Sequence, residues 1–496
     1  MNKSDNILAI DQGTTSSRAV VFDQNGQILS QTQKELLQIY PANGLVEHNA
    51  NEIWRTTYEV ARGAIDLCNA KVSAIGITNQ RETVVAWDRE TGVPIHNAIV
   101  WQDRRTAATC KTLISENLEP MVRERTGLLL DPYFTATKLR WLLDNVSGAR
   151  TLAERGLIAA GTIDSFLLWR LTGGRLHATD ATNASRTLLF NIHTQKWDSA
   201  LLELFEIPEA ILPQVKNSAD DFGYTDTELF GKAIPILGVV GDQQAALIGQ
   251  GCVHSGMIKS TYGTGCFTLL NTGNKLIYSN NRLLTTVGYR IDNSVCYALE
   301  GSIFNAGTTI KWLRDTLGVI GSASETAELA AISSKHSGVV FVPAFTGLGA
   351  PHWDPNARGA IYGLTRDTGP SELVRAALEA LGYQSAELLS SMQHDGAEIT
   401  RLRVDGAMAQ NEWMLQFLAD ITGKDVEKPA MVETTALGAA RLASLYAGVI
   451  SSVEELDGRW ELDCRYRPQL PLSERQKLLH NWKKAVESTI SFSTKP

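Results

Sequence analysis

The sequence lacks any apolar run that approaches the roughly 18 residues needed to cross a membrane. Its 44% hydrophobic and 20% charged residues are instead typical of a soluble globular protein. The opening residues, MNKSDN, lead into a short apolar run at 7–10, without the charged, apolar and small-residue regions of a secretory signal. We therefore expect a cytoplasmic protein with no membrane span.

Cysteine and histidine patterns that hold metals are also missing. The six cysteines never occur as C-x-x-C and the nine histidines form no H-E-x-x-H motif, so the sequence indicates no zinc site, and we expect reduced thiols.

The net charge of -8 and the pI near 5.7 repel a polyanion, and no basic run with interleaved aromatics offsets this repulsion. We therefore expect no nucleic-acid partner.

The first loop of the chain contains neither a G-K-[ST] Walker sequence nor a G-x-G-x-x-G fingerprint. Present instead is a run of small and hydroxyl residues between two β-rich segments: Asp11-Gln12-Gly13-Thr14-Thr15-Ser16-Ser17-Arg18. The glycine lets backbone approach a phosphate, the hydroxyls and amides can donate to phosphate oxygens, and Arg18 adds positive charge. Asp11 can hold Mg²⁺ through water. An ordinary hairpin turn explains the loop alone equally well.

Two later segments have related chemistry. Gly263-Thr264-Gly265 also lies between two β-rich runs, and two such loops facing each other could clamp one triphosphate. Residues 405–411 follow a strand and precede a helix, which suits an adenine ring against backbone, although an ordinary βα loop is the alternative. The repeated hairpin and the length of 496 residues predict two domains of related fold, which we place at residues 1–250 and 251–496.

The remaining chain alternates helical and strand patterns, which predicts the α/β class. The predicted helices include residues 51–67, 132–144 and 371–391, and the predicted strands include residues 72–78, 83–87 and 402–404. A tail helix is expected from Ser473, where Ser-x-x-Gln forms a capping box, and we expect this helix on the surface.

Together, the three loops resemble the phosphate-1, phosphate-2 and adenosine motifs of the actin, Hsp70 and sugar-kinase superfamily. Residues 133–145 and 359–379 resemble the two signatures of the FGGY carbohydrate kinases, and residues 78–83, 101–105 and 241–246 are most similar to members that phosphorylate glycerol. The resemblance implies two ribonuclease-H-like domains, each with a five-stranded mixed sheet, and a cleft between them. It also implies transfer of the γ-phosphate of MgATP to glycerol, giving sn-glycerol 3-phosphate and ADP in glycerol catabolism.

An uncharged polyol must be held by directional hydrogen bonds and by flat apolar surface against its carbon chain. Arg81 offers donors and Glu82 offers acceptors at the end of a predicted strand. Outside this context such a pair is usually solvated, and aromatic residues are usually core. The resemblance assigns the acceptor site to Arg81, Glu82, Trp101, Tyr133, Asp242, Gln243 and Phe267.

Asp242 is the candidate catalytic residue. It follows the apolar run 234–240 and precedes a small-residue helix at 243–249, so its carboxylate is expected at a strand end. By the resemblance it is the general base that accepts the proton of the attacking hydroxyl. The alternative interpretation is a helix N-cap, and one residue could serve both purposes.

The resemblance also assigns the nucleotide-binding residues: Thr14, Thr15, Ser16, Arg18, Thr264, Gly307, Lys311, Ala407 and Asn411. Two of them depart from the family pattern. Lys311 stands where the family often has Gln, and Ala407 stands where it often has a second Gly. Alanine is tolerable if this position needs no positive φ, so ATP affinity is the property that the two departures put in question.

Two other functions stay open. Another FGGY kinase, acting on a pentulose, gluconate or a different polyol, would use the same loops and base, although the contexts of Arg81, Glu82 and Trp101 argue against it. An actin-like ATPase switch would hydrolyse ATP with no small acceptor, and it leaves the two FGGY signatures unexplained.

Assembly and regulation are less constrained. A homodimer or homotetramer is compatible with the sequence. Residues 228–235 lack the repeated glycines and the arginine with which some bacterial relatives bind fructose 1,6-bisphosphate, and residues 224–230 contain no histidine for regulatory phosphorylation. We expect both controls to be absent or altered.

Overall fold

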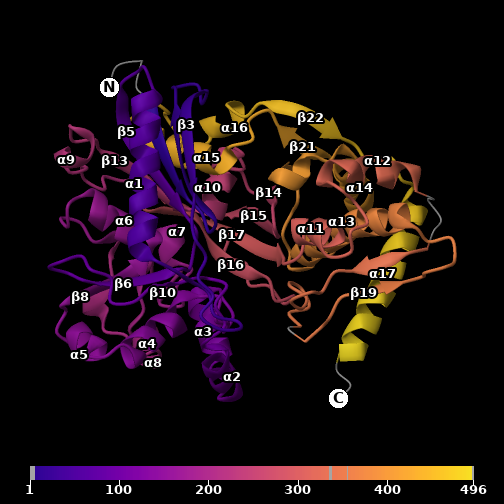
Figure 1. The fold of residues 1–496 in the computed structure, drawn as a ribbon, viewed down its shortest axis with the longest axis horizontal. Helices are drawn as coiled ribbons and strands as arrows, with labels where there is room; N and C mark the ends of the chain where they lie inside the picture. The colour runs from indigo at the N-terminus through magenta and orange to yellow at the C-terminus, as the bar shows by residue number, and fades with distance from the viewer. Residues whose placement is uncertain (1–5, 334–337, 355, 494–496) are drawn as a thin grey trace.

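The computed structural model describes residues 6–333, 338–354 and 356–493. They form two α/β lobes, drawn mainly in indigo to magenta and mainly in rose to yellow in Figure 1. Within the described ranges, no helix combines the length and apolarity that a membrane crossing needs. The predicted α/β class is confirmed.

A five-stranded mixed sheet forms the centre of the first lobe, in the order β13-β5-β1-β2-β3. The strand β1 pairs antiparallel with β2 and parallel with β5, while β3 and β13 extend the two sides. The strands are β1 (Asn6–Gln12), β2 (Ser16–Phe22), β3 (Ile28–Glu35), β5 (Val72–Asn79) and β13 (Ile236–Gly241). Because helices cover both faces, β5 and β13 are buried along their whole length.

The second lobe repeats this topology in a seven-stranded sheet of order β16-β17-β15-β14-β20-β21-β22. Here β14 pairs antiparallel with β15 and parallel with β20, as β1 does with β2 and β5. The strands are β14 (Met257–Tyr262), β15 (Cys266–Gly273), β16 (Leu284–Ile291), β17 (Ser294–Ile303), β20 (Arg401–Asp405), β21 (Val426–Pro429) and β22 (Leu462–Tyr466). Five strands were expected and this is wrong for the second lobe, because β16 and β22 add one antiparallel strand at each edge.

Smaller sheets and helices complete the lobes. A four-stranded sheet consists of β4 (Glu47–His48), β7 (Ala98–Ile99), β6 (Val84–Asp88) and β8 (Ile158–Thr162). The two-stranded sheets pair β10 (Phe190–Asn191) with β11 (Lys196–Trp197), β9 (Ala178–Asp180) with β12 (Gln214–Lys216), and β18 (Val340–Val342) with β19 (Ala360–Tyr362). The helices of the first lobe are α1 (Ala50–Leu67), α2 (Ala107–Ser115), α3 (Glu119–Thr126), α4 (Thr135–Asn145), α5 (Ala149–Glu154), α6 (Ile163–Leu171), α7 (Ala181–Ala184), α8 (Ser199–Leu204), α9 (Thr227–Phe230) and α10 (Asp242–Gly249). The later helices are α11 (Gly307–Asp315), α12 (Thr326–Ile332), α13 (Pro370–His394), α14 (Glu412–Thr422), α15 (Thr434–Tyr446), α16 (Glu455–Gly458) and α17 (Leu472–Ser493).

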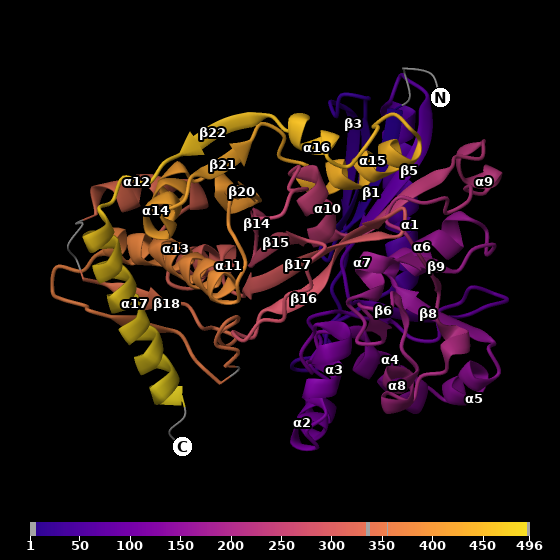
Figure 2. The same cartoon turned by 180° about the vertical axis from the view of Figure 1, so that it is seen from behind.

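Helix α15 comes from the last part of the chain but packs against β1, β5, β13 and α10. Figures 1 and 2 show α10 between the strands of the first lobe and β14, with α15 next to those strands. Two glycines permit the contact: a Cβ at Gly249 would lie 1.8 Å from the carbonyl oxygen of Thr434, and one at Gly438 would lie 1.8 Å from that of Ala245. The packing of α15 on the first lobe brings the start of this helix to the first loop. The predicted domain boundary near residue 250 stays a prediction.

The tail helix α17 differs from its prediction in two respects. It begins at Leu472, so Ser473 lies inside the helix and is not its N-cap. One face is buried, since Trp482 is 1% exposed and stacks on Tyr383 with ring centroids 5.2 Å apart. The helix therefore forms part of a small core with α13, and its expected placement on the surface holds only for its outer face.

Candidate active site

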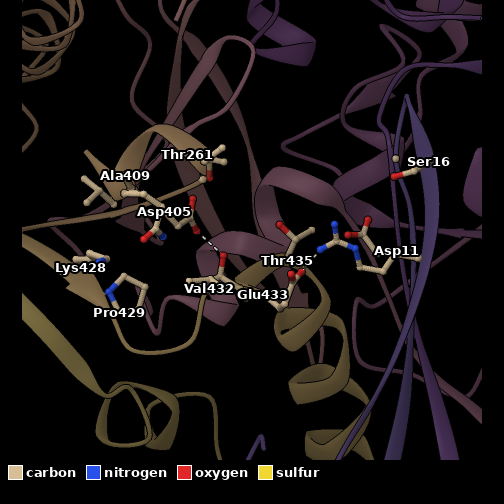
Figure 3. Close-up of a pocket in the computed structure, with 17 residues that line it drawn as sticks. Asp11, Ser16, Thr261, Asp405, Ala409, Lys428, Pro429, Val432, Glu433 and Thr435 are labelled. Atoms are coloured by element: carbon tan, nitrogen blue, oxygen red, sulfur yellow. Dashed lines mark hydrogen bonds and ion pairs between the residues drawn. The ribbon is translucent and has the colours of Figure 1, made fainter. Parts of the chain in front are cut away.

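A cavity of about 450 Å³ lies where the first loop faces the end of β20 and the start of α15. Figure 3 shows Asp11 and Ser16 on one side, Asp405, Ala409 and Lys428 on the other, and Glu433 between them. The lining residues are Asp11, Gly13, Ser16, Arg18, Thr261, Val404, Asp405, Gly406, Ala407, Ala409, Gln410, Lys428, Pro429, Val432, Glu433, Thr434 and Thr435. Four of the predicted site residues are among them: Asp11, Ser16, Arg18 and Ala407.

The first loop is a tight turn in which the backbone amide of Gly13 donates to the carbonyl of Ser16 at 2.9 Å. Arg18 forms an ion pair with Glu433 and donates to Gln33 Oε1 at 3.0 Å. Burial raises the pKa of Asp11 to about 7; Arg18 opposes this shift, and the nearby carboxylates of Asp242 and Glu433 add to it. The loop therefore presents a partly neutralised arginine beside a carboxyl group that ionises near neutral pH.

The adenosine motif begins at Asp405, whose Oδ2 accepts from Gln250 at 2.9 Å and from the hydroxyl of Thr434. Gly406 has φ 89°, and a Cβ there would lie 2.5 Å from the carbonyl oxygen of Tyr262. Ala407 starts a 3-10 turn (Ala407–Gln410), and its φ is not positive. The backbone therefore requires glycine at position 406 and accepts alanine at position 407.

The remaining predicted nucleotide residues do not line the cavity. The carbonyl of Thr264 accepts from the amides of Ala306 at 3.0 Å and Thr308 at 3.1 Å, and the amide of Gly307 donates to Gly263 at 2.9 Å, so the second loop is tied to the start of α11. Lys311 is exposed on that helix. Asn411 is the N-cap of α14, since its Oδ1 accepts from the amide of Met414 at 2.9 Å. Thr14 and Thr15 occupy the turn of the first loop.

The predicted acceptor residues converge around Arg81, at the end of β5. Its Nε lies 3.2 Å from Asp242 Oδ1, its Nη1 donates to Glu300 Oε2 at 2.6 Å, and its Nη2 donates to the hydroxyl of Tyr133 at 3.5 Å. Arg81 and Glu82 are 3% and 1% exposed, so the alternative of a solvated surface pair is wrong.

Three aromatic rings form a wall beside this group. Trp101 packs edge-on against Tyr133 and Phe267, with centroids 5.6 Å and 6.2 Å away. All three side chains are half-buried, unlike the neighbouring core residue Phe134, which is fully buried. The indole Nε1 of Trp101 donates to Thr14 Oγ1 at 2.9 Å, which connects the aromatic wall to the first loop.

Asp242 is the first residue of α10, and its side chain is 30% exposed. Gly241 is the N-cap of that helix, so the interpretation of Asp242 as the cap is wrong. Its Oδ1 accepts from the amide of Gln243 at 2.7 Å and faces Arg81, which leaves Oδ2 for another partner. The Oε1 of Gln243 accepts from the buried ammonium of Lys259.

Comparison with known proteins decides the family. Residues 6–249 match the N-terminal domain of the FGGY family of carbohydrate kinases, and residues 258–447 match its C-terminal domain. The chain belongs to the FGGY family of carbohydrate kinases. The predicted resemblance is thereby confirmed.

Among curated members of the family, a glycerol kinase of Rhodospirillum centenum is 60% identical over 98% of both chains. A glycerol kinase of Alcanivorax borkumensis is 58% identical over 97% of both. A solved glycerol kinase of Plasmodium falciparum with ADP is 37% identical, has a TM-score of 0.93 and covers 98% of each chain. A ligand-bound xylulose kinase from Lactobacillus acidophilus is 22% identical with a TM-score of 0.89, which shows the shared two-domain fold alone.

Sequence reasoning missed four charged residues of this FGGY kinase. Glu300 and Arg186 contact Arg81 and Glu82, Lys259 contacts Gln243, and Glu433 contacts Arg18. Burial lowers the pKa of Lys259. A signal existed for Glu300, because a lone charge within the otherwise apolar and neutral strand β17 requires a buried partner.

Proposed function

We propose that this FGGY kinase transfers the γ-phosphate of ATP to glycerol, forming sn-glycerol 3-phosphate and ADP. The observation that carries the proposal is the convergence of Arg81, Tyr133 and Asp242 beside an aromatic wall. A donor, a hydroxyl and a carboxylate suit the hydroxyl groups of a small polyol, and the rings suit its carbon chain. Curated relatives that are 54–60% identical and named glycerol kinase support the same acceptor.

Asp242 is the proposed general base. Its Oδ1 is occupied by Arg81 and by the amide of Gln243, so Oδ2 takes the proton of the attacking hydroxyl. Arg81 holds the carboxylate in place, because its guanidinium lies 3.2 Å from Oδ1 and leaves Oδ2 toward the acceptor. Transfer then depends on positioning the hydroxyl in line with the γ-phosphate rather than on covalent chemistry by the protein.

The other acceptor contacts follow from the same geometry. We assign hydrogen bonds with the polyol to Arg81, Glu82, Tyr133 and Gln243. Trp101 and Phe267 pack on its carbon chain, since their rings are half-buried and perpendicular to each other at an angle of 78°.

The nucleotide is proposed to occupy the 450 Å³ cavity, with its phosphates at the first loop and its adenine near Ala407. Thr14, Thr15, Ser16 and Arg18 donate to the phosphates from one lobe, and the second loop with Thr264 and Gly307 does so from the other. Neither Asn411 nor Lys311 lines the cavity. Asn411 caps α14, and the exposed Lys311 on α11 is assigned to a phosphate or the ribose.

Asp11 is the proposed Mg²⁺ contact. Within the described residues no cluster of three or more His, Cys, Asp or Glu side chains could hold a metal ion by itself. A single carboxylate fits Mg²⁺ that is held mainly by water and by substrate phosphates. The metal would neutralise charge on the phosphates, and Asp11, near the carboxylates of Asp242 and Glu433, supplies the acidic environment that attracts it.

The test is an acceptor panel. Purified protein with MgATP is offered glycerol, dihydroxyacetone, xylulose, ribulose and gluconate, and ADP release is followed. We expect strong stimulation by glycerol. Stimulation by a ketose or gluconate alone would replace the proposed acceptor, and ATP hydrolysis indifferent to all five compounds would favour a nucleotide-driven switch.

Compartment and assembly stay predictions. All six cysteines are free thiols, which fits the expected cytoplasmic location. A homodimer or homotetramer is tested by light scattering on the purified protein. Titration with fructose 1,6-bisphosphate tests the expected lack of that control, since residues 228–235 have no arginine.

A further inference from the structure

Four buried charges form a closed network directly behind the proposed acceptor site. Arg81, Glu82, Arg186 and Glu300 are 3%, 1%, 0% and 1% exposed. Glu300 accepts from Arg81 Nη1 at 2.6 Å and Nη2 at 3.2 Å, and from Arg186 Nη2 at 2.9 Å. Arg186 Nε donates to Glu82 Oε1 at 2.6 Å. The network is neutral as a whole, which is the condition under which buried charges are tolerated.

Glu300 is the centre of the network. Burial alone would raise the pKa of this carboxyl group, but the guanidiniums of Arg186 and Arg81 outweigh burial and lower it to about 2. Burial raises the pKa of Glu82 in spite of the same two arginines. The negative charge is therefore held most firmly on Glu300, the member of the network that no sequence motif marks.

The geometry restricts how Arg81 can meet the substrate and the base. Both terminal nitrogens of its guanidinium donate to Glu300, so the plane of the group is fixed. In that orientation Nε points at Asp242 Oδ1, 3.2 Å away, and Nη2 reaches the hydroxyl of Tyr133. Loss of the bidentate contact would let the guanidinium rotate about its stem and lose one or both of these contacts.

Glu82 is held in a comparable way. Its backbone has φ 62°, a conformation that side-chain-bearing residues rarely adopt, so local structure alone does not favour it. Arg186 fixes one carboxylate oxygen and leaves the other for a ligand. Arg186 also lies against the rings of Tyr133 and Phe134, at 5.6 Å and 5.2 Å from their centroids.

The network joins the two lobes. Glu300 is in β17 of the second lobe, whereas its partners come from the first. In the neighbouring strand β15, Phe267 pairs with Ser302, two residues along from Glu300. One patch of the second sheet thus provides both an aromatic side of the acceptor site and the carboxylate that aligns its arginine.

We propose that Glu300 and Arg186 are positioning residues for the phosphoryl acceptor, which set polyol affinity by fixing Arg81 and Glu82 from behind. The inference rests on the proposed function in one respect, namely that Arg81 and Glu82 bind the acceptor. It adds two residues that do not themselves contact the polyol, and it makes acceptor binding dependent on a contact between the lobes.

The decisive variant is Glu300→Gln. Glutamine has one acceptor oxygen for two guanidiniums, and its amide would face a donor, so at least one arginine loses its partner. We expect KM for glycerol to rise at least tenfold while KM for ATP stays within twofold. The matched control is Glu379→Gln, which removes another buried carboxylate paired with an arginine, Arg375 at 2.7 Å, within α13. It should lower the melting temperature without changing KM for glycerol.

Two outcomes would overturn the proposal: a KM for glycerol within twofold of the parent chain in Glu300→Gln, or an equal rise in the Glu379→Gln control. If Glu300→Gln does not fold, Arg186→Lys replaces it, because lysine keeps the charge but cannot contact Glu82 and Glu300 with one planar group. An unchanged KM for glycerol in Arg186→Lys overturns the proposal equally, and a selective rise supports it.

Glu300→Asp provides the rescue. It keeps the charge and shortens the side chain by one methylene. We expect a KM for glycerol between that of the parent chain and that of Glu300→Gln. A KM as high as that of Glu300→Gln would count against positioning by charge. The parent chain in the acceptor panel separates the two proposals. If another acceptor is preferred, the same variants are measured with that acceptor, and a selective rise in its KM still supports the network.

Discussion

The two sides of the cleft differ in how firmly their side chains are fixed before any ligand binds. On the acceptor side, Arg81 and Glu82 are buried and held by charges of the opposite sign. On the nucleotide side, Thr15 and Thr264 are exposed, and Arg18 is half-buried. A small neutral polyol offers little binding energy with which to order a site, whereas a triphosphate attracts donors from a distance. Preorganisation is concentrated where the ligand can contribute least.

The largest expected effect concerns Asp242, which faces both sides. Asp242→Asn should lower kcat about 1,000-fold, within the range typical of general bases, because an amide cannot accept the proton. Glycerol binding should change less than about tenfold, since the hydrogen-bonding geometry is retained. Stopped-flow turnover and calorimetric titration check the two quantities. Turnover near that of the parent chain would remove Asp242 from the mechanism.

The second effect tests the aromatic wall of the acceptor side. Trp101→Ala should raise KM for glycerol about 30-fold, because loss of a large apolar contact costs about 2 kcal/mol. Trp101→Phe keeps a ring but loses the hydrogen bond to Thr14, so it should change KM for glycerol less than about threefold. Steady-state kinetics with saturating ATP measure both. Equal effects of the two variants would show that the hydrogen bond, and not the ring, is what matters.

The third effect belongs to the nucleotide side. Arg18→Ala should raise KM for ATP about tenfold by removing a charged donor, with KM for glycerol unchanged. Glu433→Gln should act in the opposite direction, lowering KM for ATP about twofold, because Arg18 no longer pairs with a carboxylate. The exposed Arg62, paired with Asp66 on α1, is a matched control through Arg62→Ala. Parallel changes in both substrates' KM values would contradict the separation of the two sides.

The last effect concerns stability and not kinetics: the free energy of unfolding should depend on pH with opposite signs on the two sides. The pKa of Asp11 is raised from 3.8 to about 7 by burial, so between these values the folded protein keeps a proton that the unfolded chain has lost. Its ionisation thus makes the free energy of unfolding fall as pH rises from about 4 to 7. Asp11→Asn should be more stable than the parent chain at pH 8, and the difference should vanish toward pH 4.

Glu300 makes stability depend on pH in the opposite direction, because Arg186 and Arg81 outweigh burial and lower its pKa from 4.5 to about 2. Its ionised form adds stability that is complete above pH 4.5 and is lost as pH falls toward 2. Urea denaturation of Asp11→Asn, Glu300→Gln and the parent chain at several pH values measures both differences. A stability difference for Asp11→Asn that is constant from pH 4 to 8 would contradict the raised pKa.

Local patterns located most of the elements. The predicted helix 51–67 is α1 (Ala50–Leu67), which begins where the side chain of Asn49 accepts from two backbone amides. The predicted strand 72–78 is β5 (Val72–Asn79). These signals are local: a capping side chain and the period of apolar residues along the chain. The edge strands β16 and β22 were not predicted, because pairing at a sheet edge depends on which backbone N–H and C=O groups the neighbouring strand leaves unpaired.

The candidate site could be predicted wherever a motif carries several of its residues together. Five predicted acceptor residues do lie together around the guanidinium of Arg81, although their roles stay predictions: Arg81, Glu82, Trp101, Tyr133 and Phe267. The nucleotide residues Lys311 and Asn411 lie outside the cavity lining, because one is on an exposed helix face and the other caps α14. Motif membership indicated the neighbourhood of these two residues but not their contacts.

The sequence by itself determined the family, the α/β class and the three loops, because each depends on residues close together in the chain. Only the tertiary structure decided which charges meet. Glu300 is 219 residues from Arg81, and Glu433 is 415 residues from Arg18. No local pattern pairs residues so far apart: β17 brings Glu300 to Arg81, and the packing of α15 on the first sheet brings Glu433 to Arg18. Burial then makes these pairings decisive, since a charge without water must have a partner.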